Sequence, residues 1–570
     1  MVTAMGMGMV PSSQLPSARS YKGCNSVSEY ILTRFARVII PPSSHQFFRE
    51  MVLKTILVAV FSAPAFAQTV PTTQINSGRD SIAPAFPSAQ TAASTGFRIV
   101  PSLELTERYS DNISLAGTAL AQSDWLTTLS PGVSLEYRAA RANAVLDFRL
   151  SRLIYQSFSN LDNTQRRLLS TANIELIEKW LFIDARASTA QQNRSVFGAA
   201  EILETVNART NRIETTTYQI SPSIRGNFFT FATYQARLSG TETRAGDNAF
   251  PNTTNYDWSA TVRSAVAGPI KWSMDANGLS TENGTDGRRR DSRLRGTAAF
   301  EFDAQFRPSI LAGQEISNLN GAGDRTTTIA GIGIEWLPSN RTRLSAAAQR
   351  RFFGNDHRFE FSHRTPLTVW RIVSTKDVIA PTTVLSSIST ALADSNQASP
   401  SGGTGINPAS PGTNSISDPV LSPVGGIQNG SLIVRPYLSR RADLSLSLVG
   451  ARNTVTLSAN RREQRAIDSN RTVNSGAVPI EETRQIAASL SWAYRFSPIS
   501  TMRVVLSRSR TDALFIEGQT TTQQVQSIFY DARLGLYTFA TVGLQRNRFD
   551  STVAASFREN AFVSTLIFRF

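Results

Sequence analysis

The chain has little of the chemistry that builds disulfides, metal centres and acid–base sites. Among 570 residues there are one cysteine, Cys24, and three histidines. Cys24 precedes the export signal described below, so the mature protein has no thiol for a disulfide or a thiolate metal site. The sequence has no phosphate-binding loop and no histidine cluster with metal-ligand spacing. We therefore expect no cofactor and no resident metal ion.

Long hydrophobic runs and lysine are also scarce. No apolar stretch of about 20 residues follows residue 67, which excludes a bundle of membrane-spanning helices. The net charge is +15, and nearly all of the basic residues are arginines. These arginines are spread along the whole chain and lack the patch that nucleic-acid binding uses, so we expect no nucleic-acid partner.

Residues 51–67 have the order of a secretory signal peptide. Lys54 supplies a positive start, residues 56–61 form a short apolar run, and an Ala-Phe-Ala cleavage site occupies residues 65–67. A signal peptide normally begins a chain. We therefore interpret Met51 as the true start and residues 1–50 as a disordered extension produced by an upstream start codon.

Beyond the signal peptide, the chain changes from a flexible tail to a regular period of two. Residues 68–96 are rich in Pro, Ser, Thr and Ala, which predicts a flexible periplasmic tail. Residues 97–570 form strand-like segments separated by polar turns. In residues 442–449, for example, Ala and three leucines alternate with Asp and two serines. A strand with this pattern has one apolar and one polar face.

A soluble β-sandwich also shows such alternation, but three features favour a membrane barrel. The predicted strands, at about 10–15 residues, are longer than usual. Aromatic residues lie beside short turns, as in 336–340 and 494–498, which is typical of an interfacial girdle. The last segment ends on phenylalanine and resembles the signal that the barrel assembly machinery recognises. The residues that share its apolar face are Phe562, Leu566, Phe568 and Phe570.

Short turns and longer polar loops alternate along the chain, which allows the strands to be counted. Ten short turns, one strand before them and one after predict an antiparallel up-and-down barrel of about 22 strands, within a range of 18 to 24. A long loop near 377–440 either covers the surface or folds into the lumen as a constriction. Residues 306–318 show no clean alternation, and the phase slips near 152–154, which suggests a bulge.

Arginines on the polar phase of strands are the candidate lumen residues. They are Arg149, Arg186, Arg341, Arg343, Arg495 and Arg503. Such a lumen would favour anions, including acidic polysaccharide. Equally, these arginines could pair with carboxylates such as Asp147 and Asp184 and pack the interior. The arginine cluster in 288–293 could bind lipopolysaccharide phosphates on the outside.

Two stretches resemble a known family. Residues 107–113 (ERYSDNI) are similar to the opening strand of β-barrel porins. Residues 335–344 (EWLPSNRTRL), followed by 350–354 (RRFFG), 362–366 (SHRTP) and Trp370, resemble outer-membrane proteins of PEP-CTERM/exosortase systems. The resemblance implies a role near exopolysaccharide export and surface-protein sorting. It implies no catalytic residues.

The leading hypothesis is therefore a non-enzymatic pore or accessory protein of the bacterial outer membrane, linked to exopolysaccharide export. A structural scaffold without conductance is one alternative. An outer-membrane hydrolase is another, for which His357 and His363 are the available acid–base groups, six residues apart on one face. An energised nutrient receptor would need a plug domain of at least about 50 residues, which residues 68–96 cannot supply.

Overall fold

The computed structural model describes residues 96–198, 211–246, 251–283, 287–303, 305–321, 323–379, 436–467 and 482–570. All of these belong to one unit of the chain, Val52–Phe570. The predictions for the extension 1–50, the signal peptide 51–67, the tail 68–95 and the interior of the long loop, 380–435, fall outside the described residues.

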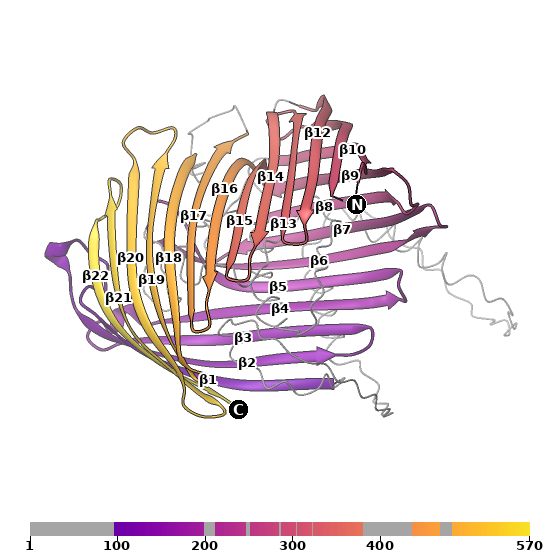
Figure 1. Cartoon of the computed structure of the whole chain (residues 1–570). Helices are drawn as coiled ribbons and strands as arrows, with labels where there is room; N and C mark the ends of the chain where they lie inside the picture. The colour runs from indigo at the N-terminus through magenta and orange to yellow at the C-terminus, as the bar shows by residue number, and fades with distance from the viewer. Residues whose placement is uncertain are drawn as a thin grey trace, which may run out of the picture. The chain divides into compact units, whose positions relative to one another are not determined.

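The described residues form a single sheet of 22 strands (Figure 1). The first eleven are β1 Gly96–Ser110, β2 Asp124–Arg138, β3 Ala142–Tyr155, β4 Asn163–Ile177, β5 Leu181–Asn193, β6 Arg212–Phe228, β7 Ala232–Ala245, β8 Thr253–Ser264, β9 Ile270–Asn283, β10 Gly287–Phe300 and β11 Phe306–Ser317. The other eleven are β12 Arg325–Ser339, β13 Thr342–Arg351, β14 Gly354–Arg364, β15 Thr368–Ile379, β16 Tyr437–Val449, β17 Asn453–Ala466, β18 Thr483–Ser497, β19 Ser500–Ala513, β20 Thr520–Arg533, β21 Thr538–Ser551 and β22 Phe557–Arg569. Two short 3₁₀ turns, η1 Thr118–Leu120 and η2 Ser159–Leu161, lie in loops. Among the described residues, no helix has the length and apolar character to cross a membrane.

The sheet closes on itself. Each strand pairs antiparallel with the next one along the chain, and β1 also pairs with β22. Closure leaves no strand with an unpaired edge, which is the condition for a sheet to cross a bilayer. The predicted all-β, up-and-down barrel of 22 strands is confirmed.

The two rims of the barrel differ in their connections. The turn rim carries short hairpins, such as 340–341 between β12 and β13 and 498–499 between β18 and β19. Each predicted short turn corresponds to one of these hairpins, and Phe570 ends at the same rim (Figure 1). The other rim, here the loop rim, carries most of the longer connections, including the one from β15 to β16. In outer-membrane barrels the short turns are periplasmic and the longer loops extracellular.

The predicted bulge at 152–154 is wrong. The register of β2 with β3 is continuous from Leu129 opposite Arg152 to Gly132 opposite Arg149. The apparent slip arises because the inward face becomes apolar near the loop rim, where Leu153 and Tyr155 are buried in a small hydrophobic cluster. Register shifts occur instead beside the turn rim, in β4–β5, β12–β13 and β18–β19. Residues 306–317, which showed no alternation, form β11.

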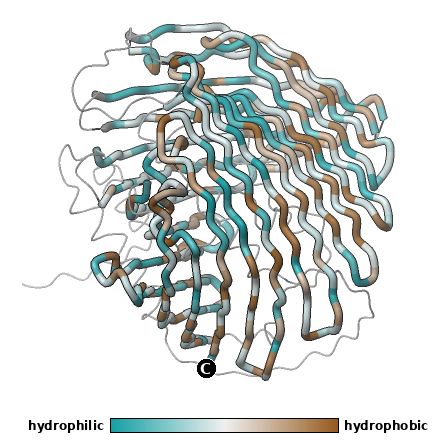
Figure 2. Tube along the Cα trace, turned by 90° about the vertical axis from the view of Figure 1, so that its left-hand side faces the viewer, coloured by the Kyte–Doolittle hydropathy of each residue, from teal (hydrophilic) through white to brown (hydrophobic). Residues whose placement is uncertain are grey.

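The outer face carries a band of large apolar side chains. On β18 the outward residues run from Ile486 to Phe496, with Leu490 and Trp492 between them. At roughly 3.4 Å per residue and a tilt of about 40°, this stretch spans about 26 Å along the barrel axis, which matches the hydrocarbon region of an outer membrane. Figure 2 shows the corresponding alternation of hydrophobic and hydrophilic positions along the strands.

Candidate functional site: the charged inner wall

Ion pairs between strands lie on the inner face of the sheet. Arg149 on β3 contacts Glu104 on β1 at 2.5 Å, and Arg237 on β7 contacts Asp184 on β5 at 3.1 Å. Each pair spans an intervening strand. These residues lie on the face opposite to the exposed apolar side chains, such as Leu129 and Ile154, which meet lipid. They therefore point inward, and strand alternation then assigns the face of every other residue.

Three of the predicted lumen arginines are paired with carboxylates on this inner face. Arg149 pairs with Glu104, and Arg343 pairs with Glu335 at 2.7 Å. Arg503 holds Asp531 through two hydrogen bonds of 2.6 and 2.8 Å. Such a bidentate pair fixes both side chains in one geometry. At these three positions, a carboxylate of the inner wall neutralises the charge of the arginine.

The other three predicted arginines lie in different surroundings. Arg186 is on the inner face of β5, within electrostatic range of Arg237 and Asp184. Arg341 lies in the turn between β12 and β13 and is exposed, so its placement on a strand was wrong. Arg495, at the turn rim, donates a hydrogen bond of 2.9 Å to the carbonyl oxygen of Ala451 in the neighbouring turn.

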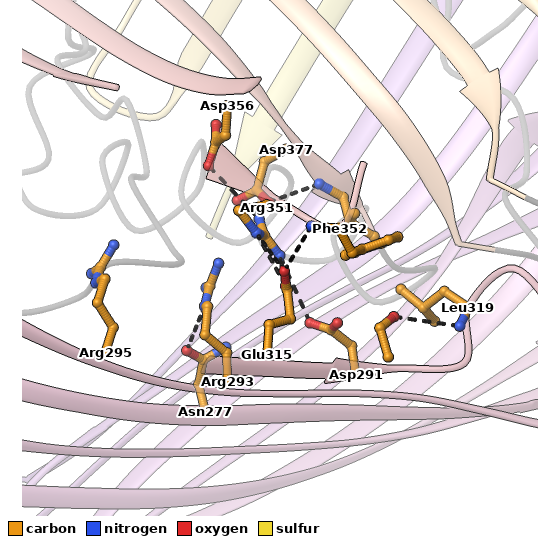
Figure 3. Close-up of polar contacts among 12 residues, drawn as sticks. Asn277, Asp291, Arg293, Arg295, Glu315, Leu319, Arg351, Phe352, Asp356 and Asp377 are labelled. Carbon is orange, nitrogen blue, oxygen red and sulfur yellow. Dashed lines mark hydrogen bonds and ion pairs between the residues drawn. The ribbon is translucent and has the colours of Figure 1, made fainter. Parts of the chain in front are cut away.

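A large buried ionic group of the inner wall was not predicted. Arg351, at the loop end of β13, is held by Glu315 and Asp377, each 2.5 Å away (Figure 3). Asp291 and Asp356 lie 3.8 Å from the same guanidinium. The exposure of Arg351 is 2% and that of Glu315 is 0%, so these two charges are largely removed from water, whereas Asp377 is 49% exposed. We call these five residues the Arg351 cluster.

The Arg351 cluster joins the loop ends of five strands. Its members come from β10, β11, β13, β14 and β15. Asp377 lies two residues before β15 ends, so the cluster fixes the strand from which the long loop departs. The backbone N–H of Phe352 also donates to Glu315, at 3.3 Å. The cluster therefore ties the shortest loop-rim hairpin to its neighbours.

Further arginines continue this charged wall along β10, towards the turn rim. Arg293 donates a hydrogen bond of 3.1 Å to Asn277, and Arg295 lies 3.5 Å from Asp275 (Figure 3 labels both arginines). Arg295 is also 3.5 Å from the side chain of Gln349. Alternation along β10 places both arginines on the same face as Asp291.

Several inner arginines lack a carboxylate partner among the described residues. They include Arg293 and Arg495, which donate to an amide and a carbonyl oxygen, and also Arg358 and Arg462. Within the described ranges, no carboxylate lies within 4.0 Å of Arg358 on β14 or of Arg462 on β17. Arg462 is also directly opposite Arg441 across the β16–β17 ladder, and Arg441 pairs with Asp443. The side chains of Arg358 and Arg462 are partly exposed. Such groups can attract an anion from solvent.

The two histidines of the barrel face outward. His357 hydrogen-bonds the hydroxyl of Ser374 at 3.0 Å, and His363 hydrogen-bonds that of Thr342 at 2.8 Å. They share a face, as their spacing predicts. Among the residues that the structure describes, no group of three or more His, Cys, Asp or Glu side chains could hold a metal ion.

The arginine cluster of 288–293 is divided between the two faces of β10. Arg288 and Arg290 point outward, whereas Arg289 and Arg293 point inward with Asp291. Arg288 lies opposite Glu282 in the β9–β10 ladder and donates a hydrogen bond to Ser280. The segment is therefore no continuous arginine surface on the outside.

A closed antiparallel barrel with an apolar outer band and a charged inner wall is an outer-membrane β-barrel, and its localisation is the outer membrane. No protein-family model matches the chain, and no curated protein matches it. Similar solved structures include the siderophore receptor PirA from Pseudomonas aeruginosa, with 9% identity, 84% of this chain and 81% of that chain covered, and a TM-score of 0.44. They also include the FrpB iron transporter from Neisseria meningitidis, with 10% identity, 82% of each chain covered and a TM-score of 0.44. The ferric enterobactin receptor of Pseudomonas aeruginosa has 8% identity, coverage of 84% and 82%, and a TM-score of 0.45.

Proposed function

We propose that the barrel is a conduit for anionic material across the outer membrane, with acidic polysaccharide as the substrate class. The observation that carries this proposal is that two inner-wall arginines, Arg358 and Arg462, have no carboxylate partner among the described residues. An unpaired guanidinium on the wall of a pore attracts anions and repels cations. Barrels of this strand number enclose a lumen large enough for a channel or an internal plug.

The link to a particular export system rests on sequence resemblance. Residues 335–344 and 350–354 are similar to outer-membrane proteins of PEP-CTERM/exosortase systems, which supports a place beside exopolysaccharide export and surface-protein sorting. We assign the chain no enzymatic step, because its two barrel histidines bind hydroxyl groups on the outer face. The apolar C-terminal face that ends on Phe570 supports delivery by the barrel assembly machinery.

Planar-bilayer recording tests the conduit. The purified chain should give discrete conductance steps, and a salt gradient should give a reversal potential of the sign for anion preference. The double variant Arg358→Gln, Arg462→Gln should shift that potential towards zero, since it removes these two unpaired charges. The control is Arg166→Gln, which removes an outward arginine already paired with Glu214. Silence at all voltages would overturn the conduit.

A structural scaffold is the second candidate, and the ion pairs of the inner wall favour it. Arg149, Arg343, Arg503 and the Arg351 cluster place neutralising carboxylates on the wall, as a packed interior would. A scaffold would conduct nothing, yet its deletion would weaken the envelope. If a deletion strain becomes sensitive to detergent and the purified protein shows no conductance in bilayers, the scaffold function is favoured over the conduit.

A further inference from the structure

The outer surface near the loop rim carries an arginine patch that the conduit does not use. The patch consists of Arg508 on β19, Arg546 and Arg548 on β21 and Arg558 on β22. Inter-strand registers place all four on the outward face, together with Leu506 and Leu544. We call this surface the β19–β22 patch.

The registers bring three of these four charges into one row, and Arg546 lies in the next row towards the turn rim. Arg508 is opposite Gln524, Gln524 is opposite Arg548, and Arg548 is opposite Arg558. Directly opposed Cα atoms of an antiparallel pair are about 4.5–5.5 Å apart, so the Arg548 and Arg558 guanidinium groups can reach one common ligand. Like charges directly opposite each other on a sheet are destabilising unless a counter-charge is present.

The protein supplies little of that counter-charge. Asp550 pairs with Arg548 at 2.8 Å. In the part of the chain that the structure describes, Arg508, Arg546 and Arg558 have no carboxylate within 4.0 Å, and all three are exposed. The nearby Asp111 receives two hydrogen bonds of 2.7 Å from Asn560. The patch therefore carries four positive charges against the single charge of Asp550.

The patch borders the apolar band directly. Leu506 and Leu544 are the next outward residues towards the turn rim on β19 and β21, and Phe562 on β22 lies opposite Leu544; their relative exposures are 43%, 58% and 36%. Nearer the turn rim, the outward residues of β19, β21 and β22 include no charged side chain. A ligand with an anionic head and acyl tails matches both parts of this surface.

We propose that the β19–β22 patch binds the phosphate groups of lipopolysaccharide in the outer leaflet, with acyl chains lying over Leu506, Leu544 and Phe562. Guanidinium groups bind phosphate through paired, charge-assisted hydrogen bonds. One phosphate between Arg548 and Arg558 would relieve the repulsion of the opposed pair. This patch is better suited to phosphate than the 288–293 segment. Three of its arginines have no carboxylate partner among the described residues, whereas Arg288 of that segment lies opposite Glu282.

The test measures binding of a deep-rough lipopolysaccharide to the full chain in detergent, by native mass spectrometry and calorimetry. The variant is Arg548→Gln with Arg558→Gln. Its affinity should fall by about tenfold or more, because each lost charge-assisted bond contributes about 1.5–3 kcal/mol in other proteins. The matched control is Arg166→Gln with Arg510→Gln, since these outward arginines already pair with Glu214 and Asp512. A difference in gel mobility between unboiled and boiled protein confirms that each barrel is folded.

Two further binding experiments identify the ligand of the β19–β22 patch. Dephosphorylated lipid A should bind the wild-type chain as weakly as lipopolysaccharide binds the double variant. Inorganic phosphate at millimolar concentration should compete poorly, because it cannot occupy the apolar band. Equal affinity of wild type and double variant, equal binding of dephosphorylated lipid, or full competition by free phosphate would each overturn the proposal.

Discussion

Arg108 on β1 donates a hydrogen bond of 2.7 Å to Glu559 on β22, across the seam where the first and last strands of the barrel meet. Both side chains are almost fully buried, at 1% and 2% exposure. Ser110 donates to the same carboxylate oxygen, also at 2.7 Å. Because the partners are 451 residues apart in sequence, this charge is neutralised only after the whole sheet has closed.

Replacing Glu559 with Ala should strongly weaken the closed barrel. The change leaves Arg108 buried without its carboxylate, and loss of one partner from a buried ion pair costs about 3–5 kcal/mol. Equilibrium unfolding in detergent with urea, followed by gel mobility, measures the loss. The control Thr565→Val removes the 2.9 Å hydrogen bond to Thr106 at the same seam, for about 1 kcal/mol or less. Equal losses in the two variants would contradict a special role for the ion pair.

The Arg351 cluster makes a prediction about the loop rim. Arg351→Met should destabilise the loop ends of β10 to β15, because four carboxylates would then lose the buried cation that they share. Hydrogen exchange should show increased opening at these ends. Adding Glu315→Gln to this variant should restore part of the protection. An unchanged exchange pattern would show that the cluster does not hold the strands together.

The fold could be read from the sequence because its physical signals are local. On β16, alternation of Leu444, Leu446 and Leu448 with serines follows from one face meeting lipid and the other meeting the lumen. The alternation of short turns and longer loops is also visible in the local sequence, and counting the turns predicted the number of strands. The apparent slip at 152–154 misled because a polar–apolar switch on the inner face resembles a shift of register.

The inner-wall site could be predicted only in part. Arg343 and Arg503 stand out by their phase in a strand, but their partners Glu335 and Asp531 require inter-strand geometry. The Arg351 cluster depends on the register of six strands, β10 to β15, and no local pattern connects its members. The error at Arg341 came from the strand boundary, since β13 begins one residue later.

The exposed ring of Phe570 predicts a defect in assembly without a defect in stability. The side chain is 72% exposed, whereas its backbone N–H donates to the carbonyl oxygen of Pro101 at 2.9 Å. Phe570→Ala keeps that hydrogen bond, so the folded barrel should unfold at an unchanged urea concentration. If the ring is part of the signal for the assembly machinery, the fraction of folded protein in cells should fall several-fold. That fraction is measured as the protein whose gel mobility changes on boiling. Normal assembly of the variant would remove Phe570 from that signal.

Neighbouring residues on β18 test which face of the sheet meets lipid. Leu490 is 38% exposed and lies opposite Leu457 and Leu506 on the outward face, near the middle of the apolar band. Ser491 points to the inner wall, opposite Thr456 and Val505. Leu490→Arg places a charge at mid-depth in lipid and should cost about 2–4 kcal/mol of barrel stability.

The matched change Ser491→Arg should cost much less, because the new guanidinium points into the barrel rather than into lipid. Unfolding in lipid vesicles, where the outer face is truly covered by hydrocarbon, gives both values. If Ser491→Arg proved the more damaging of the two, the assignment of inner and outer faces would be reversed. The reversal would place Arg358 and Arg462 against lipid, and the anionic conduit would then lose its basis.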